Sequence, residues 1–314
     1  MKQPIVAGAA AIAAIGCSVA PAPAAAADLP AHYVACAEGR AAARTALDIR
    51  PLPDGGLPGV RVRDPATGVA FEVLYDETSR PVAERCLPYL AAIYSEIAGM
   101  TAIDAVGAQW HGVVFTGTGE LPDQPGERWP VRVTGGGLDA DARRALASVL
   151  PHEQTHAAVR MTADARALPR WYREGVASWV EQSLLERIRP DLAQTRAERM
   201  RTARADMAEP LALKDWGPLR FRMPGGSGGA APPPIVNGQM IMQAGPAEAD
   251  TVKTEMAQYA AALDLLRWME AEAGRPAVVA WIAAVAAQPS PPDTNGLIVL
   301  ALTHTGLNLT PHLT

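Results

Sequence analysis

Two histidines four positions apart, with a glutamate directly after the first, constrain this chain more than any other feature. They lie in Val149–Val159, VLPHEQTHAAV. On an α-helix, positions four apart share one face and are separated by about 40° around the axis. His152 and His156 can therefore each direct an imidazole nitrogen at one point, where zinc accepts such nitrogens at about 2.0–2.1 Å. Glu153 lies one step around the helix, where it can reach a water on the metal but is poorly placed as a third ligand.

A third ligand is available in the stretch that follows, Leu168–Glu181, LPRWYREGVASWVE. Glu174 stands 18 positions after His156, on a new helix that a short connection separates from the first. Two histidines and one glutamate form a recognised catalytic zinc set, which leaves the fourth position open for water. Gly175 is expected to give the backbone room beside the metal.

The helix that carries Glu174 has two faces. One is an apolar stripe expected to face the core, formed by Val176, Trp179, Leu184 and Ile188. The other bears Glu174, Ser178 and Glu181. Ser178 or Glu181 would then orient a metal ligand from behind, and the alternative for Glu181 is an ordinary solvated glutamate.

The order HExxH followed by W-x-x-E-G-x-A-S-x-x-E resembles the pattern of the gluzincin zinc metallopeptidases. It is most similar to the aminopeptidase N-like pattern and to the bacterial peptidase MA-like proteins, over Val149–Glu181. The resemblance implies that His152, His156 and Glu174 bind Zn²⁺ and that Glu153 is the catalytic base. It also implies an α+β, thermolysin-like zincin fold, with a mixed N-terminal sheet, an active-site helix and a mainly helical C-terminal subdomain.

The family's sheet has an edge strand above the active-site helix. Val131–Thr134 stands where that strand should be, ready to pair with an extended substrate. The G-x-M-E-N signature that anchors a free N-terminus in the aminopeptidases is absent, and Thr134–Gly137, TGGG, stands upstream instead. The resemblance therefore implies zinc-dependent hydrolysis of a peptide or protein substrate, with endopeptidase activity favoured over aminopeptidase activity.

Such enzymes also use a donor that stabilises the oxyanion of the tetrahedral intermediate. In related gluzincins, a tyrosine that opens a helix after the third ligand has this role. The helix expected over Gln258–Met269 resembles that helix, so Tyr259 is the first choice and Tyr172 the second. The alternative for Tyr259 is a half-buried packing residue.

The N-terminal residues have the form of an export signal. A positive residue is followed by an apolar stretch up to Val19, and then by prolines and small residues. This pattern predicts a signal peptide over residues 1–27, cut between Ala27 and Asp28, and a periplasmic or secreted protein. Alternatively, Cys17 in the sequence AIGC is the lipidated first residue of a lipoprotein. Both routes lead out of the cytoplasm.

Cleavage there would leave two cysteines, Cys36 and Cys86. An even pair in an oxidising compartment suggests a disulfide, and the alternative is two separate buried thiols. The formal net charge of the full chain is −5 without a block of lysine or arginine, so nothing suggests nucleic acid or an anionic membrane as a partner. No apolar run beyond the signal region reaches the length of a transmembrane span.

Turn residues and periodicity predict the other elements. A hairpin is expected from Gly59–Arg63 and Val69–Tyr75, and Pro151 should kink or restart the helix that enters the histidine motif. Residues 191–222 are mixed and charged, and Met223–Pro234 is expected to be a flexible loop. Other predicted elements are strands over 110–116 and 129–134, helices over 31–47, 79–98, 139–150, 170–188, 252–273 and 276–287, and a helix or strand over 297–302.

We interpret residues 28–314 as one zincin-type catalytic domain. It would comprise an α/β subdomain over residues 28–157, which includes the HExxH helix, and a mainly helical subdomain over residues 158–314. Two other interpretations are a catalytically inactive binding or scaffold protein on a gluzincin fold and a zinc-free structural envelope protein. Three further histidines have no partner at metal-binding spacing and are expected to be structural or exposed, namely His111, His304 and His312.

Overall fold

The computed structural model describes residues 29–40, 46–53, 56–103, 110–119, 128–159, 167–207, 211–217, 235–236, 239–240 and 246–314. Of residues 235–236, 239–240 and 246–251 it describes the backbone alone. The expected signal peptide, the alternative lipidation site Cys17 and the expected loop Met223–Pro234 lie outside the described residues.

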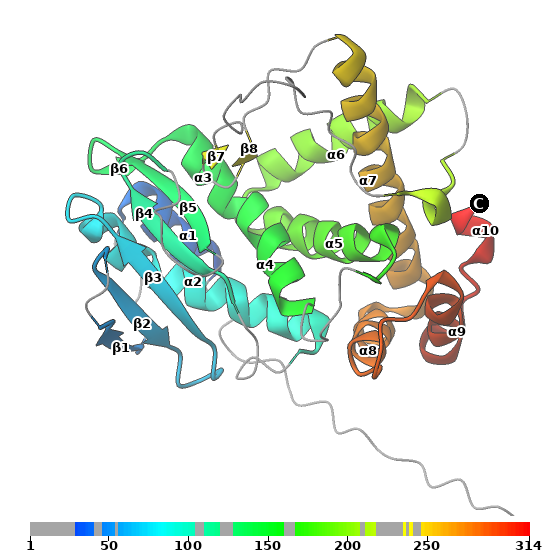
Figure 1. Cartoon of the computed structure of the whole chain (residues 1–314), viewed down its shortest axis with the longest axis horizontal. Coiled ribbons are helices and arrows are strands. Elements are labelled where there is room, and N and C mark those ends of the chain that lie inside the picture. Colours follow the sequence, from blue (N-terminus) through cyan, green and yellow to red (C-terminus); the bar gives the residue numbers. More distant parts are fainter. Residues whose placement is uncertain are drawn as a thin grey trace, which may run out of the picture.

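Most strands join in a six-stranded mixed sheet, and the protein is of the α+β class (Figure 1). The predicted hairpin is confirmed, because its two strands pair antiparallel with Val62 opposite Phe71. The next two strands run parallel to each other and to the second hairpin strand. In spatial order the strands are β1 (Asp48–Pro51), β2 (Gly59–Arg63), β3 (Ala70–Tyr75), β4 (Gly112–Thr116), β5 (Arg128–Thr134) and β6 (Gly137–Leu138).

Both ends of this sheet differ from expectation. The helix predicted over 31–47 is wrong at its end, because α1 (Leu29–Glu38) stops early and residues 46–47, just before β1, are not helical; residues 41–45 lie outside the described residues. β1 lies at the sheet edge with mostly exposed side chains, so it has no buried alternation to reveal it. At the other end, β6 pairs with Val133 and Thr134. The expected free edge is therefore already paired at its end.

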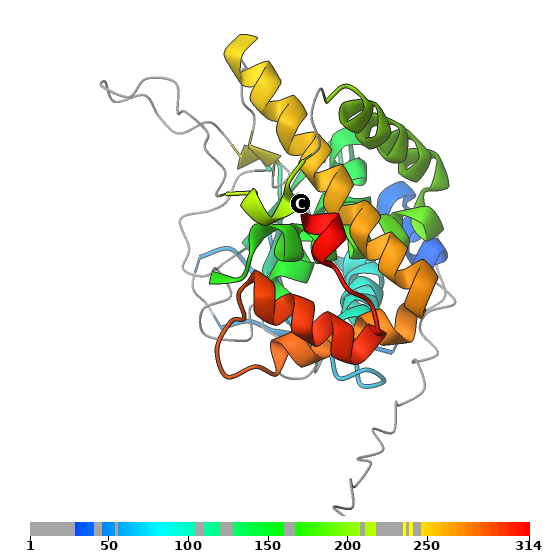
Figure 2. The same ribbon diagram turned by 90° about the vertical axis from the view of Figure 1, so that its right-hand side faces the viewer.

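The helices are arranged so that the histidine-bearing helix α4 lies between the sheet side and the helical side of the molecule. α2 packs against β3, β4, α1 and α4, whereas α5 contacts α4, α6 and α7. Figures 1 and 2 show α5 surrounded by the later helices. Beside α1, the helices are α2 (Arg80–Thr101), α3 (Ala140–Ala147), α4 (Val149–Val159), α5 (Arg170–Ile188), α6 (Pro190–Ala205), α7 (Pro246–Ala273), α8 (Arg275–Ala286), α9 (Thr294–Thr305) and α10 (Thr310–Leu313).

Two prolines set helix boundaries close to the histidine motif. Pro151 has no N–H to bond the carbonyl of Ala147, and the helix breaks at Ser148 and restarts as α4. Pro190 ends α5, as predicted, but it also opens α6, where a proline loses no hydrogen bond. Helix α6 was not predicted, because few of its residues are buried, namely Ala193, Met200 and Ala203.

A disulfide joins Cys36 of α1 to Cys86 of α2, with their Cα atoms 4.3 Å apart. The bond closes a sequence separation of 50 residues and ties α1 to the helix that covers the sheet. Both cysteines are fully buried. The suggested disulfide is therefore present. None of the described helices combines the length and apolar character that a membrane crossing requires.

Close packing of α5 on α7 depends on a glycine. A Cβ atom on Gly175 would lie 3.1 Å from Leu266 Cδ2 and 3.4 Å from both the Cβ and the carbonyl oxygen of Ala262. The expectation that Gly175 gives room beside a metal is therefore wrong, because the space above it belongs to α7. The predicted apolar stripe of α5 is confirmed, since its members are all buried.

Replacing Gly175 with valine should lower the free energy of unfolding by about 1–3 kcal/mol, because the added methyl groups overpack the contact with α7. Gly99 of α2 is the matched control, since a Cβ there meets nothing within 4 Å. Gly99→Ala should instead raise stability by up to about 1 kcal/mol, the helix-propensity difference. Chemical denaturation measures both. An unchanged Gly175→Val variant would show that α7 is not held this closely.

Candidate metal centre

Helix α4 is buried on all sides except one stripe. Val149, His152, Glu153 and His156 are partly accessible, at the spacing of one helix face, while the other residues of the helix are buried. Polar side chains such as histidine and glutamate are usually found on exposed helices and not on a helix of the core. Here they form the single open face of a core helix, which is typical of a site rather than of packing.

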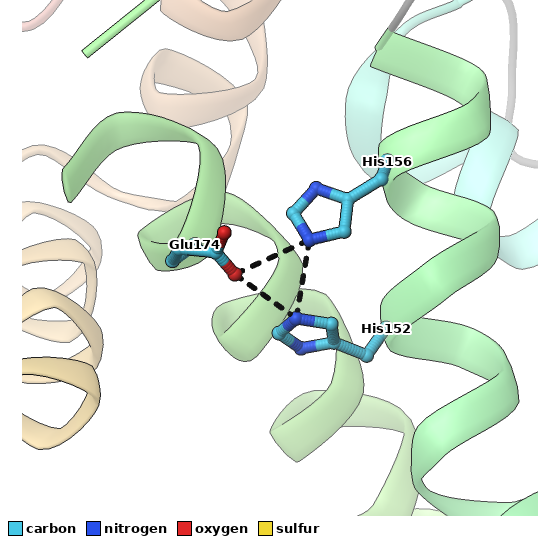
Figure 3. A group of neighbouring side chains, drawn as sticks. All are labelled: His152, His156 and Glu174. Atoms are coloured by element: carbon cyan, nitrogen blue, oxygen red, sulfur yellow. Dashed lines mark hydrogen bonds and ion pairs between the residues drawn. The ribbon is translucent and has the colours of Figure 1, made fainter. Parts of the chain in front are cut away.

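Three ligand atoms converge at this face, as Figure 3 shows. His152 Nε2 lies 3.2 Å from His156 Nε2, and Glu174 Oε2 lies 3.3 Å and 3.2 Å from these two nitrogens. Ligands bound at about 2.0–2.1 Å in a tetrahedron are separated from each other by about 3.3 Å. The spacing of all three pairs therefore fits one tetrahedral metal ion with its fourth position open.

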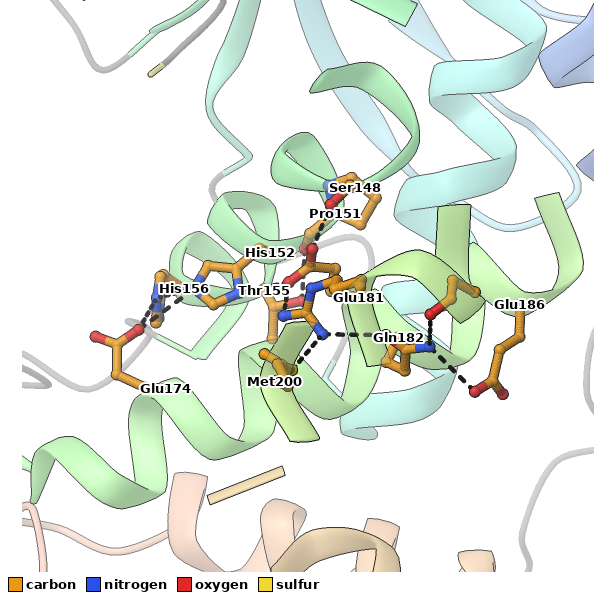
Figure 4. A network of polar contacts seen from close by, with 12 residues as sticks. Ser148, Pro151, His152, Thr155, His156, Glu174, Glu181, Gln182, Glu186 and Met200 are labelled. Atoms are coloured by element: carbon orange, nitrogen blue, oxygen red, sulfur yellow. Dashed lines mark hydrogen bonds and ion pairs between the residues drawn. The ribbon is translucent and has the colours of Figure 1, made fainter. Parts of the chain in front are cut away.

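Glu181 fixes the ring of His152 from behind (Figure 4). His152 Nδ1 lies 3.1 Å from Glu181 Oε2, and the Ser148 hydroxyl donates to Glu181 Oε1. A carboxylate can only accept, so Nδ1 carries a hydrogen, and in the neutral ring the lone pair is then on Nε2, where a metal could bind it. Glu181 is buried, so it is not the solvated glutamate of the alternative. The hydroxyl of Ser178 has no hydrogen-bond partner in the described structure, and Glu181 alone orients His152.

The charges around the pair of histidines are strongly coupled. Burial by itself lowers the pKa of His152, but the hydrogen bonds to Glu174 and Glu181 outweigh it and raise this pKa to about 10. Burial acts in the opposite sense on Glu174, yet its bonds to His152 and His156 hold its pKa far below the ordinary range. The site therefore keeps Glu174 ionised and favours positive charge at its centre.

Arg170 completes the other side of the site, where α7 crosses the start of α5. Its guanidinium forms a two-fold hydrogen bond with Glu255 of α7, at 3.0 Å and 2.6 Å, and its Nε lies 4.0 Å from Glu174 Oε1. It also lies over the ring of Trp216, 4.6 Å from the centroid. The sequence offered no signal for this group, because its members are brought together only by the packing of α7.

Tyr259 of α7 lies within this group. Its ring is 6.1 Å from the ring of His152 and 5.0 Å from that of Trp216. Burial and the charge of Glu174 raise the pKa of Tyr259, against the opposing effect of Arg170. The structure thus brings this predicted site residue beside the three ligand atoms, as a neutral hydroxyl that can donate a hydrogen bond.

The second tyrosine candidate is not at the site. Tyr172 is fully buried, and its ring packs edge-on against Trp281 of α8, 5.1 Å between centroids. Its position on α5 is turned well away from that of Glu174, so Tyr172 is a core residue. His304 and His312 lie in α9 and α10, and neither belongs to the ligand cluster of the described residues.

No role was predicted for Gln154, which lies inside the histidine motif. It is fully buried and ties α4 to the start of β4: its Oε1 accepts from the His111 N–H at 3.0 Å, and its Nε2 donates to the His111 carbonyl at 2.8 Å. The same Nε2 reaches the Tyr94 hydroxyl of α2 at 3.1 Å. These bonds fix how α4 is turned against the sheet, and therefore which of its residues face outward.

Neither a protein-family model nor a curated protein sequence matches this chain. Any functional assignment therefore depends on the geometry of the site itself.

Gln154→Leu should lower the free energy of unfolding by about 1–3 kcal/mol, because it leaves the partly buried N–H and carbonyl of His111 without the bonds to Gln154. Denaturant unfolding measures the loss. Gln288 is the control, since its amide only bonds to a carbonyl one turn back in α8, and Gln288→Leu should change stability by less than about 0.5 kcal/mol. Equal effects of the two substitutions would contradict the anchoring role of Gln154.

Proposed function

We propose that this protein is an exported, zinc-dependent metallopeptidase of the gluzincin, peptidase MA-like kind, with a thermolysin-like zincin arrangement of sheet and helices. One observation carries the proposal: His152, His156 and Glu174 place their ligand atoms 3.2–3.3 Å apart on the accessible face of α4. Two imidazole nitrogens and one carboxylate are a donor set suited to Zn²⁺. Glu153 shares that face.

Zinc in this position would supply Lewis acidity, which polarises a carbonyl group and acidifies water. Glu153 is the general base: it accepts a proton from the attacking water and can pass it to the leaving amine. Glu181 keeps the Nε2 lone pair of His152 directed at the site. Tyr259 donates a hydrogen bond to the oxyanion that develops on the substrate carbonyl, which its position beside His152 and Glu174 supports.

The substrate in this proposal is a peptide or protein, cut internally rather than at its N-terminus. The reason is that the chain lacks the signature with which the aminopeptidases bind a free N-terminus. Export is supported by the disulfide between Cys36 and Cys86, because such bonds persist in oxidising compartments.

The protein expressed from Asp28 should contain about one zinc per chain, measured by elemental analysis after gel filtration. His156→Ala removes one ligand and should reduce this content to near zero. His304→Ala is the matched control: His304 is an exposed histidine in α9, and its loss should leave the zinc content unchanged. Wild-type protein that takes up no zinc even after reconstitution would reject the proposal.

Glu153→Gln should keep its zinc and its fold but lose activity by a factor of about 10²–10⁴ in kcat, since an amide cannot accept the proton from water. The assay is cleavage of a peptide library read by mass spectrometry, followed by kinetics on the best substrate. A Glu153→Gln variant with full activity would rule out this mechanism. Zinc binding without cleavage in the wild type would favour the inactive binding or scaffold protein.

A further inference from the structure

The carboxylate behind His152 is itself held by a residue from a third helix. Arg196 of α6 donates from Nη2 to Glu181 Oε2 at 2.6 Å, and this is the same oxygen that faces His152 Nδ1. The Ser148 hydroxyl takes the other oxygen. One hydrogen-bonded path therefore runs from α6 through Glu181 of α5 to the ligand His152 of α4 (Figure 4).

Arg196 is held in one position by groups outside the site. Its other terminal nitrogen, Nη1, lies 3.1 Å from Gln182 Oε1 and 3.4 Å from Met200 Sδ. The Gln182 amide is oriented with Oε1 toward Arg196, because its Nε2 donates to the carbonyl of Ala193, at 3.3 Å, and to Glu186. The guanidinium fork thus has both branches occupied, and its rotation would break bonds on two helices.

The charge of Arg196 is also needed where it lies. Glu181 is 5% exposed, and a buried carboxylate without a counter-charge is strongly unfavourable. In the described structure the ion-pair partners of Glu181 are His152 and Arg196. A histidine that binds a metal does so as a neutral ring, which leaves Arg196 as the permanent positive charge beside this carboxylate.

We propose that Arg196 is a positioning residue for the metal site. It keeps Glu181 in the orientation in which Oε2 accepts the Nδ1 hydrogen of His152, so that His152 Nε2 points at His156 and Glu174. This inference rests on the proposed zinc site and adds α6, a helix that carries none of the three ligand residues, to the elements that determine metal affinity.

The test measures the dissociation constant for Zn²⁺ by competition with a chromophoric chelator, for the protein expressed from Asp28. Arg196→Met should weaken binding about 10- to 100-fold, the effect of losing support behind a ligand. Arg204→Met is the matched control: Arg204 is another arginine of α6 that pairs with a neighbouring helix, here α7 through Asp264, but away from the site. This control should bind zinc within about twofold of wild type. Circular dichroism and thermal melting of the metal-free proteins compare the folds.

A double-variant cycle shows whether Arg196 acts through Glu181. In a Glu181→Ala background, Arg196→Met should have almost no further effect on zinc affinity. An undiminished effect there, or a zinc affinity of Arg196→Met equal to that of wild type, would overturn the proposal. If Arg196→Met does not fold, Arg196→Gln takes its place under the same criteria, since it removes the charge and keeps a hydrogen-bonding end.

A failure of the proposed function is distinguishable from a failure of this inference. Wild-type protein that binds no zinc would reject both. Wild-type protein that binds zinc as tightly as Arg196→Met does would reject the role of Arg196 alone.

Discussion

The hydrogen bond between His152 Nδ1 and Glu181 Oε2 is the constraint on which the site depends. It decides which ring nitrogen of His152 is available, and it forms only when α4 and α5 are in one register. Two contacts help to hold this register from opposite sides: α5 packs against α7 around Gly175, and α4 is bonded to the start of β4 through Gln154. The packing of the core therefore also determines the geometry of the site, because a small shift of α4 or α5 would separate His152 Nδ1 from Glu181 Oε2.

The break in the helix before the histidine motif contributes directly to this arrangement. Pro151 prevents α3 and α4 from forming one continuous helix, and the residue at the break, Ser148, is then free to turn its hydroxyl to Glu181. A continuous helix would carry α4 along the axis of α3. Pro151, next to the candidate ligand His152, thus supports the site, because α4 is then oriented by its packing on α5 and not by the direction of α3.

The parts of the structure that follow from local patterns were predictable, and those that follow from distant packing were not. The i, i+4 spacing of His152 and His156, the β2–β3 hairpin and the buried stripe of α5 are properties of short segments. Strand β1 and helix α6 bury too few side chains to show a period. Arg170 and Arg196 belong to the site only because α6 and α7 fold back onto α5, and an arginine that will be buried looks in sequence like an exposed one.

The balance of charge explains why this arrangement of residues suits a cation. Glu181 is paired with Arg196, and Glu255 is paired with Arg170, so each of these carboxylates is offset by a neighbouring guanidinium. Glu174 has no such close partner, since the Nε of Arg170 is 4.0 Å away and its terminal nitrogens are bound to Glu255. The negative charge of Glu174 is left facing two imidazole nitrogens. A divalent metal ion would supply the missing positive charge, and so would a proton on the histidine pair, which is why the pKa of His152 is raised. A proton and a metal ion would therefore compete for the same three atoms, and the arginine pairs at Glu181 and Glu255 leave Glu174 as the carboxylate available to either.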